Sequence, residues 1–300
     1  MHIIQIGLPK SGNFWLRTIL TNMFQLANQE NRSFIQSQPI YDIAKTWDLS
    51  VRGQIAIDFL DITPNALFYR IGNIFRYPVD DIDDYINRCS LVWTHSQFSP
   101  KVLDILPKFD KAVYILRDPR DVAISWANFV FSPYMRRYYP FLITGDTEPS
   151  SYLNNHLQEI ITDWVNHVGG YLAAQGELSI HWLFYENLLT SFDAEIEELL
   201  AFLEIELDSN ARTALKNQVD FTTMKKDNPN HLRKGSVKQW VNILSEEQQN
   251  VVLKIAKPVL EELNYPLNTQ EEKLPKLPVD FNQSAFNTSG KVVLLTPAPH

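Results

Sequence analysis

MHIIQIGLPKSGNFWLRTIL, residues 1–20, places a short apolar run, a glycine-containing loop and an amphipathic segment in direct succession. Residues 2–6 predict a buried strand, and the apolar spacing of residues 13–27 predicts a helix. Backbone N–H groups at the start of such a helix point outward, where the helix dipole favours an anion. The loop is therefore a candidate anion-binding site, and Lys10 adds a full positive charge to it.

The loop does not have the pattern of a magnesium-nucleotide site. That pattern requires G-x-x-x-x-G-K followed by Ser or Thr, whose hydroxyl binds Mg²⁺. The segment GLPKSGNF (7–14) lacks it, because its lysine precedes the second glycine. We therefore expect no ATP-type metal site here. Taken alone, the loop fits a purely structural strand-to-helix turn equally well.

Composition narrows the class of protein. The 300 residues carry a net charge of −8, which argues against broad nucleic-acid binding. The single cysteine, Cys89, excludes a disulfide within the chain and is interpreted as a buried core residue. The sequence shows no signal-peptide pattern and no apolar run of about 18 residues. A cytoplasmic protein without stable membrane insertion is expected.

Strand and helix patterns alternate along the rest of the chain. Because parallel strands need helical crossovers, this order predicts one α/β domain with a central parallel sheet flanked by helices. We assign residues 1–267 to this domain and 268–300 to an extended, Pro-rich tail. The further expected strands are 89–95, 111–118 and 178–188, and the further expected helices are 119–130, 151–174, 193–204 and one that begins at the capping box SEEQ (245–248).

Ligands of such sheets gather where parallel strands end. The expected strand ends are the loop 7–13, His95, Arg117–Asp118 and Tyr185–Glu186. Arg117 stands where a phosphate could bind, with Ser125 two helical turns further on. Arg233, Lys234 and Gly235 form a second basic turn. Three separate anion-binding devices indicate a ligand with two phosphate-like ends.

Four motifs together resemble the cytosolic sulfotransferases that use 3′-phosphoadenosine 5′-phosphosulfate (PAPS). The similarity runs in order from residue 3 to about 265. It implies a P-loop NTPase-like, nucleotide-kinase-like three-layer fold and sulfuryl transfer from PAPS without a metal. The motifs are LPKSGNFWL (8–16), YILRDPRDVAISWANF (114–129), LFYENL (183–188) and DFTTMKKDNPNHLRKGSVKQWVN (220–242).

The resemblance also implies a role for particular residues. Lys10 would lie on the oxygen that bridges phosphate and sulfate, and His95 would be the general base. Tyr185 and Phe221 would flank the adenine. The 5′ side would be lined by Ser11, Gly12, Asn13, Phe14 and Trp15, and the 3′-phosphate would be held by Arg117, Ser125, Arg233, Lys234 and Gly235.

Elementary chemistry agrees with this assignment. Sulfuryl transfer to an alcohol needs the acceptor proton removed, and a neutral imidazole suits that task at cellular pH. A cation on the leaving phosphate oxygen stabilises the transition state. Several positions depart from the family pattern, among them Lys238 and Gln239, which stand where Gly-Asp is common. Asn13 and Phe14 stand where two threonines are usual, and Trp93 replaces a frequent lysine two residues before the histidine.

The acceptor is less defined by the sequence. Residues 40–80 and 128–150 are irregular and rich in aromatic side chains, which favours a small apolar or aromatic hydroxyl acceptor. A carrier-bound acceptor and a homodimer stay open, as do two other functions, a small-molecule P-loop kinase and a non-catalytic 3′,5′-ADP-binding protein. The aromatic residues considered for the acceptor site are Phe59, Phe68, Tyr69, Phe75, Tyr77, Phe129, Phe131, Tyr134, Tyr138, Tyr139 and Phe141.

Overall fold

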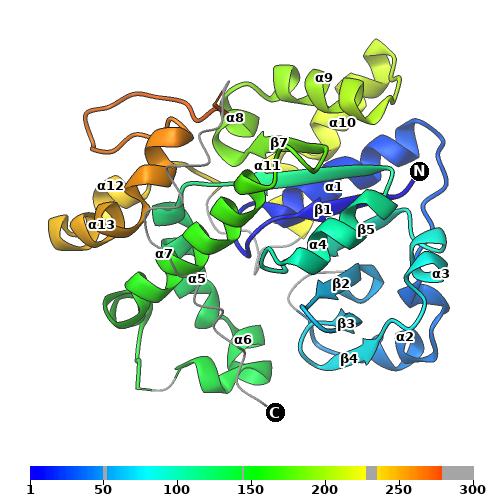
Figure 1. The fold of residues 1–300 in the computed structure, drawn as a ribbon, viewed down its shortest axis with the longest axis horizontal. Helices are drawn as coiled ribbons and strands as arrows, with labels where there is room; N and C mark the ends of the chain where they lie inside the picture. Colours follow the sequence, from blue (N-terminus) through cyan, green and yellow to red (C-terminus); the bar gives the residue numbers. More distant parts are fainter. Residues whose placement is uncertain (50–52, 144, 228–234, 279–300) are drawn as a thin grey trace.

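Seven strands form one mixed sheet in the computed structural model, which describes residues 1–49, 53–143, 145–227 and 235–278. The strand order is β4-β3-β2-β5-β1-β6-β7, and the sheet runs through the middle of the molecule (Figure 1). The strands are β1 (Ile3–Ile6), β2 (Asp58–Ile62), β3 (Leu67–Ile71), β4 (Phe75–Pro78), β5 (Leu91–Thr94), β6 (Lys111–Leu116) and β7 (Ile180–Phe184).

The strand that opens the chain lies at the centre of the parallel part. β1 pairs in parallel with both β5 and β6, and all four of its residues are buried. β2 and β7 extend the parallel set on either side. The four strands expected from the sequence are confirmed, except that residues 185–188 begin helix α8 instead of continuing β7. The carboxyl ends of β1, β5, β6 and β7 therefore meet at one edge.

The segment 58–78 supplies strands that the sequence did not predict. β3 pairs antiparallel with β2 and with β4, so the sheet is mixed and not wholly parallel. These strands have only four or five residues and interleave charged side chains, such as Asp61 and Arg70, with apolar ones. Such short, half-polar runs do not stand out from loops by hydrophobic pattern alone.

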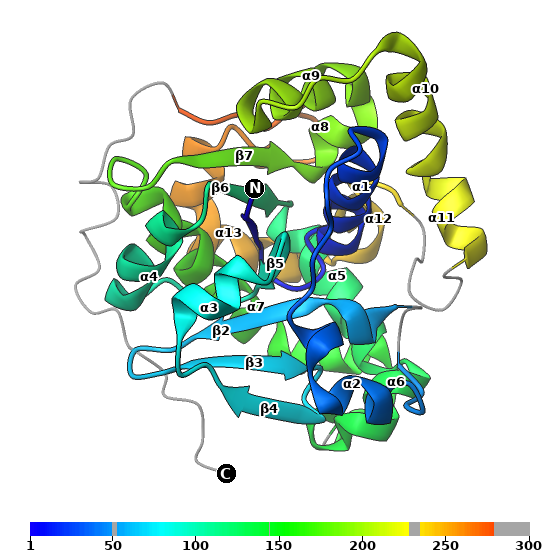
Figure 2. The ribbon, with the colours of Figure 1, turned by 90° about the vertical axis from the view of Figure 1, so that its right-hand side faces the viewer.

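Helices cover both faces of the sheet, which gives three layers (Figures 1 and 2). On β6, Val113 and Ile115 pack with α1, α9 and α10, whereas Tyr114 and Leu116 pack with α5, α7 and α13. The helices are α1 (Asn13–Leu26), α2 (Pro39–Ala44), α3 (Ile82–Asn87), α4 (Pro100–Ile105), α5 (Pro119–Val130), α6 (Pro133–Tyr138), α7 (Pro149–Ala173), α8 (Tyr185–Thr190), α9 (Phe192–Leu203), α10 (Ser209–Gln218), α11 (Phe221–Asp227), α12 (Trp240–Ile243) and α13 (Glu246–Glu262), with 3₁₀ turns at Ile35–Ser37, Gln54–Ala56, Leu106–Lys108 and Pro140–Ile143.

Capping side chains fix the starts of two helices. The Asp118 carboxylate accepts a hydrogen bond from the Arg120 N–H at 2.9 Å, and a proline occupies the first position of α5. Ser245 and Gln248 form the expected capping box of α13. The start of α5 matters for the site, because it fixes the backbone directly after β6.

The first residues of the expected tail pack back on the domain. Residues 268–278 contain neither helix nor strand, and the Lys276 N–H donates to the Leu263 carbonyl at 3.0 Å. The Asn187 amide of α8 donates to the Pro275 carbonyl at 3.2 Å. Residues 279–300 lie outside the described ranges. Among the helices of the described residues, none is long and apolar enough to cross a membrane.

Candidate active site

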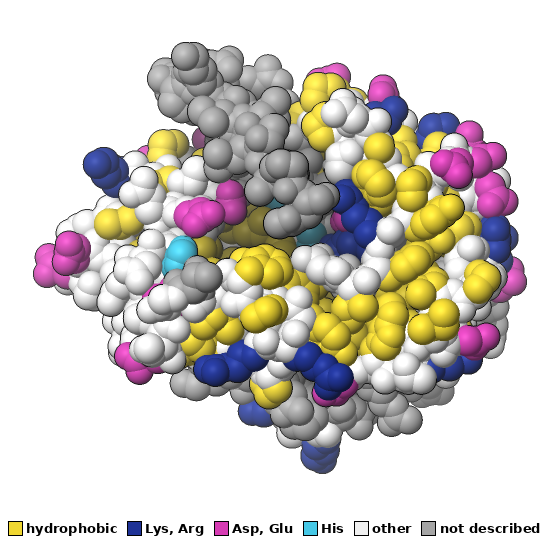
Figure 3. Space-filling view, turned by 90° about the horizontal axis from the view of Figure 1, so that it is seen from below, with side chains coloured by type: hydrophobic (Ala, Val, Ile, Leu, Met, Phe, Trp, Pro, Cys, Tyr) yellow, Lys and Arg dark blue, Asp and Glu magenta, His cyan; other side chains and the backbone are white. Residues whose placement is uncertain are grey.

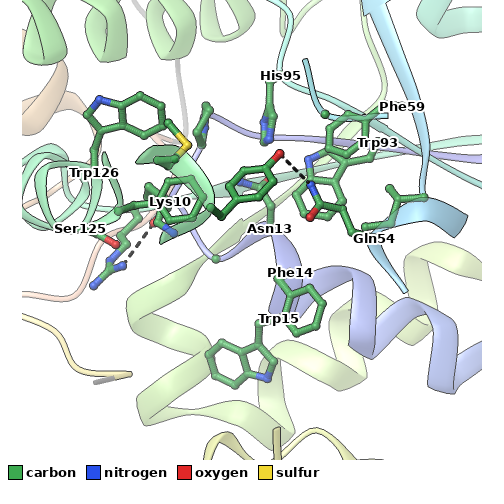
Figure 4. A pocket seen from close by; sticks show the side chains of 18 of the residues that line it. Lys10, Asn13, Phe14, Trp15, Gln54, Phe59, Trp93, His95, Ser125 and Trp126 are labelled. Atoms are coloured by element: carbon green, nitrogen blue, oxygen red, sulfur yellow. Dashed lines mark hydrogen bonds between the residues drawn. The ribbon is translucent and has the colours of Figure 1, made fainter. Parts of the chain in front are cut away.

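A cavity of about 330 Å³ opens at the carboxyl ends of the parallel strands. It collects side chains from the loop after β1, the ends of β5 and β6, and the start of α8 (Figure 4). Figure 3 shows a hollow with largely hydrophobic walls, with histidine and Lys or Arg side chains in and beside it. The expected site residues that line the cavity are Lys10, Gly12, Asn13, Phe14, Trp15, His95, Arg117, Ser125, Tyr185 and Gly235.

The remaining expected residues have other placements. Ser11 is 1% exposed and lies inside the loop after β1. Phe221 begins α11, but its side chain is outside the description. Arg233 and Lys234 fall in the segment 228–234, outside the described ranges.

The loop after β1 needs a glycine at position 12. Gly12 has φ of +102°, and a Cβ built there would lie 2.6 Å from the Tyr185 ring. Lys10 also has a positive φ, of 73°. The hydroxyl of Ser11 is buried and has no hydrogen-bond partner among the described residues. This tight turn therefore holds a buried polar group that suits a ligand.

Asn13 makes two hydrogen bonds within the loop after β1. Its side-chain amide donates to the Leu8 carbonyl at 2.7 Å, and its backbone carbonyl accepts from the Gln5 side chain at 2.7 Å. A Cβ built on Gly7 would lie only 2.4 Å from the Asn13 Oδ1, so the Asn13 amide takes the space beside Gly7. Asn13 therefore links the end of β1 to the first turn of α1.

Arg117 joins three parts of the site. Its Nη1 donates to the Lys10 carbonyl at 3.2 Å, and its Nη2 donates to the Ser236 carbonyl at 3.0 Å. The guanidinium lies 4.3 Å from the centre of the Tyr185 ring. Its Nε is buried and has no partner in the described part of the chain. That N–H can serve a bound anion.

The Arg117–Asp121 pair is part of the interior and not a surface ion pair. The two side chains are 3.8 Å apart and are 7% and 0% exposed. Asp121 also accepts a hydrogen bond from the Trp240 N–H at 3.1 Å. Burial raises the pKa of Asp121 to about 6. Asp121 thus positions both Arg117 and the segment that follows Gly235.

A second buried carboxylate supports the end of β6. Glu186 accepts hydrogen bonds from the Asp118 N–H at 3.0 Å and from the Tyr265 hydroxyl at 3.1 Å. Burial raises the pKa of Glu186 to about 7. Arg120 completes the cluster, because it donates to Asp118 at 2.6 Å and to the Pro266 carbonyl at 2.6 Å.

Trp15 and Tyr185 form an aromatic wall on the α1 side. Their ring centres are 5.6 Å apart in an edge-on arrangement, and Phe192 stacks on Trp15 at 6.3 Å. The Trp15 indole N–H donates to the Val219 carbonyl at 2.9 Å. This wall has the flat apolar surface that suits a purine base.

His95 is oriented by the loop after β1. Its Nδ1 is hydrogen-bonded to the Gly7 carbonyl. Since a carbonyl only accepts, Nδ1 carries the proton and Nε2 keeps its lone pair. Burial, together with the nearby positive charge of Arg70, lowers the pKa of His95 to about 3. The imidazole is therefore neutral at cellular pH.

Lys10 lies beside Ser125 and Trp126 in the cavity (Figure 4). Its ammonium lies 3.9 Å from the centre of the Phe129 ring on α5. An ammonium over an aromatic face keeps its charge. A neutral imidazole and a cation therefore line the same cavity.

Two departures from the family pattern meet in space. Phe14 packs against a buried apolar cluster formed by Ile57, Phe59 and Trp93. Phe59 stacks on Trp93 with ring centres 4.9 Å apart. One apolar wall therefore occupies the positions where a hydroxyl and a lysine are usual.

The irregular segments contribute only part of their aromatic residues to the cavity. Phe59, Phe129, Tyr134 and Tyr139 line it. The other aromatic residues named for this role do not appear in its lining. Ten further lining residues were not among the expected site residues, and most of them come from segments without a regular apolar pattern. These ten are Pro9, Gln54, Ile57, Arg70, Gly72, Asn73, Trp126, Met135, Met224 and Gln239.

The fold and its cavity define a class of protein. The loop after β1, an arginine directly after β6, an aromatic wall and a neutral histidine line one cavity at the carboxyl ends of parallel strands. Ligands of open α/β sheets bind at this place, so the class is an α/β ligand-binding protein. The chain belongs to the sulfotransferase family, because residues 1–264 match the family model described as the sulfotransferase domain.

Curated relatives agree with this membership. The chain is 24% identical over 272 residues to the amine sulfotransferase of Oryctolagus cuniculus, covering 82% of this chain and 76% of that one. It is 26% identical over 275 residues to sulfotransferase 1B1 of Mus musculus, covering 82% and 78%. The expected family and enzyme class, a sulfotransferase, are thereby confirmed.

Solved structures agree on the fold. The mouse sulfotransferase SULT7A1, complexed with PAP, matches with a TM-score of 0.55 and 18% identity over 86% of this chain and 83% of that one. Retinol dehydratase, in a complex with retinol and PAP, matches with a TM-score of 0.58 and 19% identity over 88% and 83%. The expected α/β class and P-loop-like architecture are confirmed.

Proposed function

We propose that this chain transfers the sulfuryl group of PAPS to a hydroxyl of a small aromatic or apolar acceptor. The supporting observation is that the loop after β1, Arg117 and His95 line one cavity. Membership of the sulfotransferase family supports the reaction class, and PAP, named in the neighbouring complexes, supports the donor.

The residues present fit the two anionic ends of PAPS. The buried Ser11 hydroxyl and the buried Nε of Arg117 have no partner in the described ranges, and both suit phosphate oxygens. Ser11, Gly12, Asn13 and Trp15 would hold the 5′ side. Bound PAPS supplies an electrophilic sulfuryl group whose leaving group is 3′,5′-ADP.

The 3′-phosphate would be held by residues from one strand end, one helix and a turn. Arg117 lines the cavity directly after β6, and Ser125 lines it from α5. Gly235, with φ of +59°, lines it beside Ser236, whose carbonyl accepts a hydrogen bond from Arg117. Arg233 and Lys234 remain predicted contacts, as does Phe221 with the adenine.

His95 would act as the general base. Its Nδ1 is committed to the Gly7 carbonyl, which leaves the Nε2 lone pair to accept the acceptor hydroxyl proton. Its lowered pKa keeps this lone pair available well below neutral pH. The proton moves from the acceptor oxygen to Nε2 as that oxygen attacks sulfur.

Lys10 would offset the negative charge that develops on the oxygen between phosphate and sulfur. Lys10 and His95 both line the cavity. A base for the acceptor hydroxyl and a cation for the leaving oxygen at one cavity support in-line transfer. The charge of Lys10 is thus placed where the leaving group departs.

The experiment follows 3′,5′-ADP release from PAPS with a panel of phenols and alcohols. We expect turnover with at least one acceptor, its loss in His95→Ala, and unchanged 3′,5′-ADP affinity in that variant. His156→Ala, a histidine on α7 paired with Asp146, is the matched control.

No transfer and no 3′,5′-ADP binding contradict the proposal, as does magnesium-dependent binding of ATP in its place. Nucleotide binding without any turnover indicates a non-catalytic binding protein.

A further inference from the structure

Arg70 belongs to a row of side chains that crosses three strands. Phe59 on β2 pairs with Arg70 on β3 and also with Trp93 on β5. Directly paired residues project from the same face of a sheet. The guanidinium lies 4.3 Å from the centre of the Phe59 ring, and Phe59 in turn stacks on Trp93. The row therefore brings a cation to the apolar wall of the cavity.

The Arg70 side chain is held in one orientation. Its Nε donates to Asp61 at 2.8 Å, and its Nη1 donates to the Gly72 carbonyl at 3.2 Å. The side chain is only 15% exposed and lines the cavity. A guanidinium has five N–H donors, and within the described ranges these two bonds use two of them. The remaining donors can serve a ligand.

The charges around Arg70 do not cancel. Asp61 pairs with Arg70 and also with Arg76, at 3.3 Å. Two guanidinium groups therefore share one carboxylate, which leaves a net positive charge at this wall. An anion that binds there gains a charge-assisted, bidentate partner.

Neutral polar groups surround the same end of the cavity. Gln54 donates to the Tyr134 hydroxyl at 3.4 Å, which lies 3.3 Å from the Tyr139 hydroxyl. The Asn73 N–H donates to that second hydroxyl at 2.8 Å. All four residues line the cavity with Arg70. This end is thus polar and cationic, while Phe14, Phe59 and Trp93 supply an aromatic wall next to it.

We propose that the acceptor carries a carboxylate, separate from the hydroxyl that receives sulfate, and that Arg70 binds this carboxylate. The inference rests on the proposed function and specifies its acceptor as an aromatic hydroxy acid. Arg70 determines specificity in this reading. The aromatic body of the acceptor packs on the Phe59 and Trp93 wall, and its hydroxyl faces His95.

The test compares phenolic acids with their methyl esters. The pairs are 4-hydroxyphenylacetate, 3-(4-hydroxyphenyl)propanoate and 4-(4-hydroxyphenyl)butanoate, each with its ester, so that spacer length varies at constant phenol chemistry. We expect at least one acid to exceed its ester by about tenfold or more in kcat/KM. Arg70→Gln should lower kcat/KM for that acid by about 10- to 100-fold, mainly through KM, and change the ester by less than about threefold.

Two further variants keep the result interpretable. Arg70→Lys retains charge without the bidentate fork and should keep part of the preference for the acid. Arg76→Gln removes the other partner of Asp61, at a side chain that is 46% exposed, and should lower the preference for the acid by less than Arg70→Gln does, because the guanidinium that binds the carboxylate stays in place. Thermal melting confirms that each variant is folded. Equal losses on acid and ester overturn the inference, because Arg70 would then act on the transferring sulfuryl group.

Calorimetry separates failure of this inference from failure of the proposed function. The wild-type protein is first titrated with 3′,5′-ADP, and its complex is then titrated with the preferred acid and ester. No binding of 3′,5′-ADP contradicts the proposed function. Binding of 3′,5′-ADP without any preference for an acid over its ester overturns the role of Arg70 alone. Tighter binding of the acid, lost in Arg70→Gln, supports it without need of turnover.

Discussion

Arg117 donates a hydrogen bond to the backbone carbonyl of Lys10, and this bond joins the end of β6 to the loop after β1. The same guanidinium reaches the Ser236 carbonyl, so segments more than a hundred residues apart converge on one cation. The geometry of the proposed phosphate site therefore depends on a side chain that binds backbone as well as ligand.

Replacing Arg117 should weaken nucleotide binding strongly. Arg117→Gln removes a buried charge and the link between the two loops, so we expect 3′,5′-ADP affinity to fall by about 10- to 100-fold. Isothermal titration measures the change. Arg137→Gln is the control, because Arg137 is 62% exposed and pairs only at the surface with Asp48. Equal affinity in Arg117→Gln and the wild type would remove Arg117 from the site.

Gly12 should not tolerate a side chain. Gly12→Ala forces a Cβ against the Tyr185 ring at a φ of +102°, and we expect a loss of about 2 kcal/mol or more in stability together with impaired nucleotide binding. Gly145→Ala is matched in backbone, with φ of +85°, and its Cβ meets no described atom within 4 Å. Denaturant unfolding of both variants separates the clash from the backbone strain. A similar loss in both would contradict the role of the clash.

The kcat/KM of the enzyme should not fall at acid pH with a midpoint near 6.5, the usual pKa of histidine. His95 has its pKa lowered to about 3, so it stays neutral and competent as a base from pH 8 down to pH 5. We expect log kcat/KM to show no break near pH 6.5 over that range, measured with an acceptor that does not itself titrate there. A slope of one below pH 6.5, with 3′,5′-ADP affinity unchanged over the same range, would show that His95 becomes protonated in the free enzyme. A parallel loss of 3′,5′-ADP affinity would instead assign the slope to Asp121 beside Arg117.

Glu186 should make the fold less stable as the pH rises. Its pKa of about 7 lies above the unfolded value of about 4.5, so the folded state binds the extra proton between these values. The stabilisation is complete below pH 4.5 and is lost as the pH rises through 7. Glu186→Gln keeps acceptor and donor groups for Asp118 and Tyr265 but cannot ionise.

The variant should therefore behave differently at the two ends of this range. At pH 8 we expect Glu186→Gln to be more stable than the wild type, by an amount on the order of 2 kcal/mol. At pH 5 the two proteins should be similar. Glu198→Gln, at an exposed position on α9, is the control and should show no such dependence. A variant that is less stable at pH 8 would show that the ionised carboxylate strengthens its hydrogen bonds more than burial disfavours its charge.

The placement of the residues proposed to hold the donor could be predicted because it depends on local pattern. Residues 3–16 form strand, loop and helix through neighbours in the chain, and Asp118 caps α5 two residues before the N–H it binds. Parallel strands then bring their carboxyl ends to one edge, which places the residues that follow them in one cavity. The orientation of the Asn13 side chain could not be predicted, because its hydrogen bonds with Leu8 and Gln5 depend on the folded loop.

The acceptor half could not be predicted in the same way. Residues 54–73 and 125–139 are distant in the chain and meet in the folded structure, where Gln54 bonds to Tyr134 and Asn73 to Tyr139. Their polarity pattern is irregular. Arg70 reaches the cavity because β3 pairs with β2 in one register, and a shift of one residue would point it to the other face. Apolar periodicity carries no information about that register in strands so short.

By itself, then, the sequence determined the strands β1, β5, β6 and β7, the loop that joins β1 to α1, and the strand ends that carry Arg117, His95 and Tyr185. These are properties of consecutive residues, governed by backbone preferences, helix capping and burial pattern. Only the tertiary structure decided that Phe14 and Trp93 share one wall, that Asp121 holds Arg117 from within, and that Arg70 lines the acceptor end. Those relationships come from packing between distant segments, where shape and charge are matched across space and not along the chain.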